Sequence, residues 1–162
     1  MKTLIVYDSM FGNTEKVARA AAEALAPAGQ ASVVRPDEAS PADLGSFDLL
    51  IVGTPVQGGR PTKAISGFLG RIPEDALINI HVAAFDTRIS AKEKSFGLKI
   101  VVGIFGYAAG RILDVLKSKG GIPAAAPEGF IVEDREGPLR AGELERAAAW
   151  AKAILVSLSA PR

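Results

Sequence analysis

Residues Thr3 to Leu25, with the sequence TLIVYDSMFGNTEKVARAAAEAL, carry the strongest structural signal in this chain. The segment opens with an unbroken β-branched and aromatic run that ends at Tyr7, a pattern typical of a strand covered on both faces. A polar loop follows, and from Thr14 to about Pro27 apolar residues recur at helical spacing. A buried strand that leads directly into an amphipathic helix predicts a βαβ architecture with parallel strands.

On either side of that pattern, strands and helices alternate along the rest of the chain. Further strands are expected at 31–35, 47–53, 77–85 and 122–132, the last interrupted at 127–129. Helices are expected at 63–69, 111–119 and 142–158, and a polar loop at 86–94. The short apolar run at 97–105 fits a strand or a buried helix, and we favour a helix. Strands this apolar need helices on both faces, so the fold class is α/β, a doubly wound five-stranded parallel sheet.

Length and composition point to one globular domain. The chain has 162 residues, of which 48% are hydrophobic and 23% charged, so we expect residues 1–162 to form a single domain. The 19 basic and 18 acidic side chains give a net charge of +1, which offers no reason to expect nucleic acid or an acidic membrane as a partner.

Cysteine content and hydropathy bear on the compartment. The chain has no cysteine, which excludes disulfides and thiolate metal sites and suits a reducing cytoplasm. Residues 1–6 are too short an apolar stretch for a signal peptide, and the run at 100–110 is shorter than the roughly 18 residues of a membrane span. We therefore expect a soluble cytoplasmic protein.

The loop after the first strand, from Asp8 to Thr14, has the features of an anion site. In a doubly wound sheet, ligands bind beyond the carboxyl ends of the strands, which here means the loops after Tyr7, Gly53 and Phe85. The first loop leads into a helix N-terminus, whose unpaired amides attract anions, and it contains hydroxyls and a glycine. It has no Lys or Arg, and the chain has neither GxxxxGK[ST] nor GxGxxG, so a single terminal phosphate suits it best. A capped strand–helix turn without a ligand is the alternative interpretation.

These loops resemble those of flavodoxin-like FMN proteins. Ser9 to Thr14 (SMFGNT) is similar to the phosphate-binding loop of that family, and it stands in the same place after the first strand. Gly53 to Pro61 (GTPVQGGRP) is similar to the second flavin loop, and Phe85 to Arg88 (FDTR) stands where the third is found. The likeness spans essentially the whole chain in element order. It implies strand order 2-1-3-4-5, with one FMN across the ends of strands one, three and four.

The resemblance also implies a set of FMN-binding residues. They are Ser9, Met10, Phe11, Gly12, Asn13, Thr14, Thr54, Pro55, Val56, Gln57, Gly58, Gly59, Arg60, Phe85, Asp86, Thr87 and Arg88. The first loop would hold the ribityl phosphate, and residues 55–60 would border the isoalloxazine edge. In the family, a glycine peptide there turns its carbonyl toward flavin N5 during reduction, and Gly58 and Gly59 tolerate the positive φ this requires. A simple flexible loop is the alternative for these two glycines.

The chain departs from the family pattern at the flavin ring. Flavodoxins commonly stack the ring between Trp and Tyr, whereas residues 54–62 contain no aromatic residue and Trp150 lies in the last predicted helix. The apolar candidates for the ring wall are Phe11, Phe85, Pro55 and Val56. The other candidate for the ring wall is a second subunit, as in oligomeric FMN-dependent quinone reductases of this fold. The first loop of those enzymes resembles residues 7–12.

Two arginines lie on the predicted flavin loops. A cation near flavin N1 would favour the reduced anionic flavin and raise its potential, so Arg60 and Arg88 are candidates for that role. An ordinary surface arginine is the alternative for each.

The preferred interpretation is an FMN-binding electron-transfer flavoprotein that passes electrons singly between protein partners. It assigns no catalytic side chain and no metal site, and a carrier is favoured over a turnover enzyme. The first alternative is an FMN-dependent NAD(P)H:quinone reductase, with quinone and nicotinamide nucleotide as partners. The second is a flavin-free interaction module of the same fold. A monomer or a small homo-oligomer is expected, without nucleic acid or membrane as partner.

Overall fold

The computed structural model describes residues 1–90 and 107–160, so the expected helix at 97–105 lies outside the described residues. The strands are β1 (Lys2–Tyr7), β2 (Gln30–Val34), β3 (Leu49–Pro55), β4 (His81–Ile89), β5 (Ile122–Pro123) and β6 (Glu128–Val132). The helices are α1 (Asn13–Leu25), α2 (Lys63–Arg71), α4 (Ala108–Ser118) and α5 (Glu143–Ser159), with short 3-10 turns at Ala26–Ala28 and Pro41–Ser46. None of these helices, nor any other helix among the described residues, is long and apolar enough to cross a membrane.

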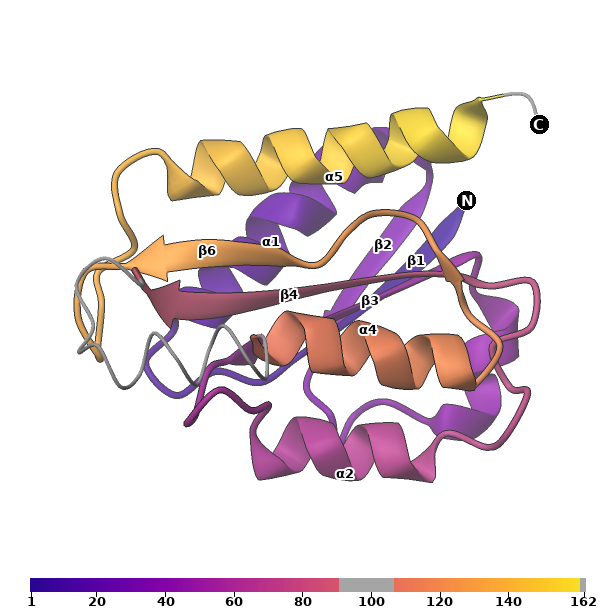
Figure 1. Cartoon of the computed structure of the whole chain (residues 1–162). Helices are drawn as coiled ribbons and strands as arrows, with labels where there is room; N and C mark the ends of the chain where they lie inside the picture. The colour runs from indigo at the N-terminus through magenta and orange to yellow at the C-terminus, as the bar shows by residue number, and fades with distance from the viewer. Residues whose placement is uncertain (91–106, 161–162) are drawn as a thin grey trace.

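The sheet is parallel with the order β2-β1-β3-β4-β5, which confirms the predicted doubly wound topology. Helices α1 and α5 cover one face of the sheet, and α2 and α4 cover the other (Figure 1). Successive residues of a strand point to opposite faces. On β3, Leu50 and Val52 therefore pack in the core under α2 and α4, whereas Leu49 and Ile51 pack in the core under α1 and α5.

The fifth position of the sheet is shared by two short strands. β5 pairs with the start of β4, and β6 pairs with its end. The predicted strand at 122–132 is thus interrupted at 124–127, and the interruption predicted at 127–129 was wrong in its position. Gly129 lies inside β6 opposite Asp86, and the Arg88 guanidinium occupies the space that a Cβ at Gly129 would need.

Strand β4 starts and ends four residues later than predicted. Residues 77–80 form turns, and Leu77 donates its N–H to the carbonyl of Lys119. Leu77 and Ile80 are apolar because both are buried under the sheet, and not because they belong to it. At the other end, the predicted loop at 86–94 was wrong over 86–89, because β4 continues there in register with β3 as far as Thr87 and with β6 as far as Ile89.

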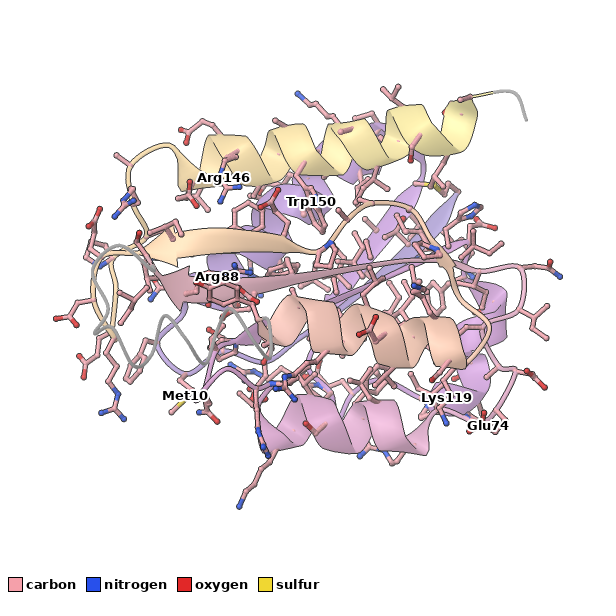
Figure 2. All side chains as sticks on the ribbon, viewed as in Figure 1. Met10, Glu74, Arg88, Lys119, Arg146 and Trp150 are labelled. Carbon is pink, nitrogen blue, oxygen red and sulfur yellow. The ribbon has the colours of Figure 1, made fainter. Side chains whose placement is uncertain are left out.

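An aromatic cluster connects the end of β4 to α5. The rings of Phe85, Phe130 and Trp150 meet edge to face, with centroids 5.9 to 6.0 Å apart. Figure 2 shows Trp150 directed from α5 toward the sheet. The ring of Phe85 also lies against the backbone of Gly53, where a Cβ would collide with it. Packing therefore requires glycine where β3 approaches the predicted second loop.

Candidate functional site

A cavity of about 470 Å³ lies at the carboxyl edge of the sheet. Its described lining residues are Ser9, Met10, Phe11, Asn13, Thr14, Pro55, Val56, Gln57, Gly58, Gly59, Thr87, Arg88, Ile89, Val132 and Arg135. All three predicted loop regions contribute to this list, so the structure brings them together around one space. The volume lies in the range of small-molecule and cofactor sites.

The backbone of the first loop is arranged around Gly12. Ser9 Oγ accepts the Gly12 N–H at 3.0 Å, and Asp8 Oδ1 accepts the Ser9 N–H at 2.9 Å. Gly12 has φ 89° and is the N-cap of α1, and no atom lies within 4 Å of where its Cβ would be. Backbone conformation alone therefore favours glycine at this position. The first amides of α1 follow directly, and they have no acceptor within the helix.

Side chains of the first loop connect it to two other segments. The Asn13 amide donates to the carbonyl of Glu136 at 3.1 Å, which fixes the segment after β6. The hydroxyls of Thr14 and Thr87 share a buried hydrogen bond of 2.8 Å. Two of the predicted phosphate ligands thus each make one side-chain hydrogen bond within the protein, and the first-turn amides of α1 and Ser9 Oγ–H are further donors for an anion.

The second loop is a tight turn. Gln57 and Arg60 exchange backbone hydrogen bonds of 2.9 and 3.0 Å, and the intervening Gly58 and Gly59 have φ of 56° and 76°. A two-residue turn with positive φ at both central positions strongly favours glycine. Thr54 is fully buried, and its hydroxyl accepts the Thr62 N–H at 3.1 Å, so it holds the loop closed without lining the cavity.

Arg60 lies at the end of this turn but is not among the described residues that line the cavity. It lines a second hollow, between α2 and α4. The structure therefore places Arg60 outside the lining of the first cavity, while Gln57, to which it is hydrogen-bonded, lines both hollows.

The predicted third loop, Phe85 to Arg88, is the end of strand β4, and its residues alternate between the two faces. Phe85 is fully buried in the aromatic cluster, so it is not exposed to the cavity. Asp86 is also fully buried; it accepts the Ala109 N–H at 2.9 Å near the start of α4. Thr87 and Arg88 are the members of this group that line the cavity.

The charge of Arg88 is compensated inside the protein. Its guanidinium donates two hydrogen bonds to Asp86, at 2.6 and 3.0 Å, and stacks on the Tyr107 ring at 3.4 Å from the centroid. The side chain is 16% exposed. Arg88 is therefore held in one position at the cavity wall, as half of a neutral pair.

Sequence reasoning missed Arg35, which follows β2. Its guanidinium lies 3.2 Å from the Asp8 carboxylate and over the Tyr7 ring. The predicted loop has no basic residue of its own, yet the neighbouring strand supplies one at its base. Strand order 2-1-3 was the available signal, because it places the residue after β2 beside the loop after β1.

Three lining residues were also missed: Ile89, Val132 and Arg135. The last two belong to the end of β6 and the segment after it. The fifth strand ends at the same edge of the sheet as the others, so the search for loops could have included it.

The cavity combines a donor-rich end with an apolar wall. None of the described lining residues is an Asp or Glu, and two are arginines. Met10 and Phe11 line the cavity and are 53% and 44% exposed, which is unusual for large apolar side chains. An anionic ligand with an apolar body would neutralise the two arginines and cover the exposed side chains of Met10 and Phe11.

Known proteins match this chain in sequence and in fold. The family model described as Flavodoxin matches residues 5–122, well over half of the chain. Among curated proteins, a match is the NAD(P)H dehydrogenase (quinone) of Gluconacetobacter diazotrophicus, at 34% identity over 41% of this chain. The chain spans 44% of the length of that relative.

Solved structures match over nearly the whole chain. A flavodoxin from the domain Archaea has a TM-score of 0.77 at 15% identity, covering 99% of this chain and 100% of its own. Oxidised Flavodoxin 1 from Bacillus cereus has a TM-score of 0.73 at 19% identity, covering 98% and 100%. Rubredoxin oxygen:oxidoreductase from Desulfovibrio gigas has a TM-score of 0.66 at 22% identity, covering 98% of this chain and 37% of its own. At these identities the structural matches establish the fold.

Proposed function

The chain belongs to the flavodoxin family of FMN-binding electron-transfer proteins, and we propose that it holds one FMN noncovalently in the cavity at the carboxyl edge of the sheet. In this proposal it carries electrons between protein partners. The residues at the edge of the sheet hold this FMN, and electrons pass to and from it one at a time.

One observation carries this assignment. The start of α1, with Ser9 Oγ–H and unpaired first-turn amides, meets an apolar wall around a single cavity whose described lining contains no carboxylate. A phosphate monoester attached to an apolar ring system matches both ends of that cavity.

The phosphate would be held by the first loop. Ser9 Oγ–H and the amides of Asn13 and Thr14 are its donors, and the left-handed conformation of Gly12 shapes the loop around them. Arg135 adds positive charge from the segment after β6, while Arg35, paired with Asp8, lies at the base of the loop. Hydrogen bonds to a charged group contribute about 1.5 to 3 kcal/mol each.

The ring would lie between the first and second loops. Met10, Phe11, Pro55 and Val56 provide apolar surface that excludes water, and the Gly58–Gly59 turn borders the edge. FMN, when bound, supplies one-electron and two-electron redox chemistry. The residues of this chain bind it, orient it and exclude water, while Arg88 remains fixed by Asp86 and Tyr107.

The test is a titration of the flavin-free protein with FMN and with riboflavin, which lacks the phosphate. We expect flavin absorption bands and quenched flavin fluorescence, with FMN bound more tightly than riboflavin. Ser9→Ala should weaken FMN binding about tenfold, the equivalent of one charge-assisted hydrogen bond, and leave riboflavin binding unchanged. The control is Ser118→Ala, whose hydroxyl lies exposed at the end of α4. A protein that binds neither flavin would instead be the flavin-free interaction module.

A second candidate function rests on the relative named NAD(P)H dehydrogenase (quinone). In this alternative the chain takes hydride from a nicotinamide nucleotide and reduces a quinone, with a second subunit closing the ring site. Rapid NADPH oxidation that depends on added quinone, together with a stable oligomer in solution, would favour it over the carrier. We also propose a cytoplasmic location, which suits a chain without cysteine.

A further inference from the structure

A second hollow, of about 650 Å³, lies between helices α2 and α4, and we call it the α2–α4 groove. The two helices run side by side on one face of the sheet (Figure 1). The groove adjoins the flavin cavity, because Gln57 lines both. It has no part in the FMN site proposed above.

The charged side chains that line the groove are all cations. Arg60 and Lys63 come from the second loop and the start of α2, and Arg111 and Lys119 come from α4. No Asp or Glu is among the described lining residues, although the chain as a whole carries only one net positive charge. The positive charge of the groove is therefore a local feature and not a reflection of overall composition.

The two ends of the groove differ in how their cations are paired. Lys119 forms an ion pair of 2.6 Å with Glu74, and Figure 2 shows both residues close together near the end of α4. Arg60 and Lys63, at the end nearer the flavin cavity, are exposed and form no ion pair within residues 1–90 and 107–160. That end has uncompensated positive charge for an anion.

Apolar side chains lie between the charged ends. Pro61, Leu69 and Val115 line the groove, and Leu69 is nearly fully buried. A hollow of this volume with apolar walls and a few convergent charges has the character of a small-molecule site. Protein partners usually meet broader surfaces, so the concavity favours a small ligand over an acidic protein.

We propose that the α2–α4 groove binds a small organic phosphate of the nucleotide class. The phosphates lie against Arg60 and Lys63, and the apolar part of the ligand lies over Leu69 and Val115. Arg60 thereby acquires a role in a ligand site of its own, next to the flavin cavity but outside it. The inference goes beyond the proposed function and does not depend on it.

The experiment measures binding of ADP, inorganic pyrophosphate and adenosine by calorimetry at low salt, with amide chemical shifts to locate them. It is carried out on the flavin-free protein and on the FMN-loaded protein. We expect ADP and pyrophosphate to bind and to shift amides of residues 60–70 and 111–119, with adenosine weaker. The double variant Arg60→Ala/Lys63→Ala should weaken ADP binding at least tenfold, as expected for the loss of charge-assisted hydrogen bonds.

Two controls make the result specific. Lys117→Ala/Lys152→Ala removes the same charge from exposed positions that do not line the groove, and it should leave ADP binding unchanged. Ser9→Ala should also leave it unchanged, which separates the groove from the FMN cavity. Equal losses in both double variants, no saturable binding of ADP at millimolar concentration, or tighter binding of poly-L-glutamate than of ADP would each overturn the proposal. ADP binding to a protein that takes up no FMN would support the groove while contradicting the flavin assignment.

Discussion

Phe85 and Asp86 are neighbours in β4, yet they lie in two very different environments. Phe85 points to the side of α1 and α5, where it packs against Phe130 and Trp150. Asp86 points to the side of α2 and α4, where its carboxylate holds Arg88 and the start of α4. Both side chains are fully buried. One side of this strand end is thus held by apolar packing and the other by a single charge pair with its hydrogen bonds.

The difference shows which interactions stabilise the fold and which position the site. Buried aromatic area contributes directly to stability, because its removal leaves a cavity. A buried ion pair contributes little net stability, but it is costly to break, since one partner is then left as an uncompensated charge. The pair formed by Asp86 and Arg88 therefore fixes geometry at the cavity wall, while the aromatic cluster holds the sheet to α5.

The largest effect is expected on the aromatic side. Phe85→Ala should lower the free energy of unfolding by about 3 to 5 kcal/mol, because the ring is completely buried. Urea denaturation followed by circular dichroism measures the change. The control is Phe11→Ala, at a position that is 44% exposed, for which we expect a loss below about 1 kcal/mol. Similar losses in the two variants would contradict the contrast between core and cavity wall.

A smaller loss is expected on the polar side. Asp86→Asn should lower the free energy of unfolding by about 2 to 3 kcal/mol. This is less than the loss expected when a fully buried ion pair is broken, because the Arg88 side chain still reaches water. The double variant Asp86→Asn/Arg88→Met removes both charges and should regain part of that loss. If the double variant were less stable than the single one, the pair would be a net source of stability and our account of this side would be wrong.

A third prediction concerns pH, near the aromatic cluster. The hydrogen bond from Arg146 holds the pKa of Glu143 below its ordinary value of 4.5, and the Ile131 amide adds to this against the opposing effect of burial. A carboxylate whose pKa is lowered by folding stabilises the folded state at pH values above its pKa in the unfolded chain. That stability is lost as the pH falls through its pKa in the folded protein. Glu143→Gln should therefore lower the free energy of unfolding by about 1 to 2 kcal/mol at pH 7, and by less below pH 4.

Urea midpoints between pH 3 and pH 7 test this prediction. The control is Glu145→Gln, at an exposed position of the same helical turn, which should leave the pH dependence of the wild type intact. A loss for Glu143→Gln that is the same at every pH would mean that the charge of Glu143 does not contribute.

The smallest effects are expected on the potential of bound FMN. Arg88→Met leaves the charge of Asp86 uncompensated beside the cavity, so the midpoint potential should fall by the equivalent of about 1 kcal/mol. Asp86→Asn/Arg88→Met should restore most of the shift. Arg60→Ala should shift the potential less, because Arg60 does not line the cavity. Spectroelectrochemical titration measures all three, and no fall in either single variant would remove the idea that these arginines tune the flavin.

Much of the fold and of the first loop could be predicted from local patterns. The apolar run before Asp8, the helical spacing after Gly12 and the GG pair at 58–59 each reflect a requirement that neighbouring residues impose. The end of β4 could not be predicted in this way. Residues 86–88 are polar, and they are in a strand because β6 pairs with all three and β3 pairs with Asp86 and Thr87 from the other side.

The residues of the candidate site also fall into a group set by local sequence and a group set by tertiary structure. The anion-binding character of the first loop follows from a strand, a glycine and a helix start that are adjacent in the chain, so sequence was sufficient for it. Arg35 and Arg135 come from elsewhere in the chain, and only the folded sheet brings Arg35 to the base of the first loop and Arg135 to the cavity wall. Short-range backbone preferences are encoded locally, whereas charge pairing and cavity walls depend on which strand ends become neighbours.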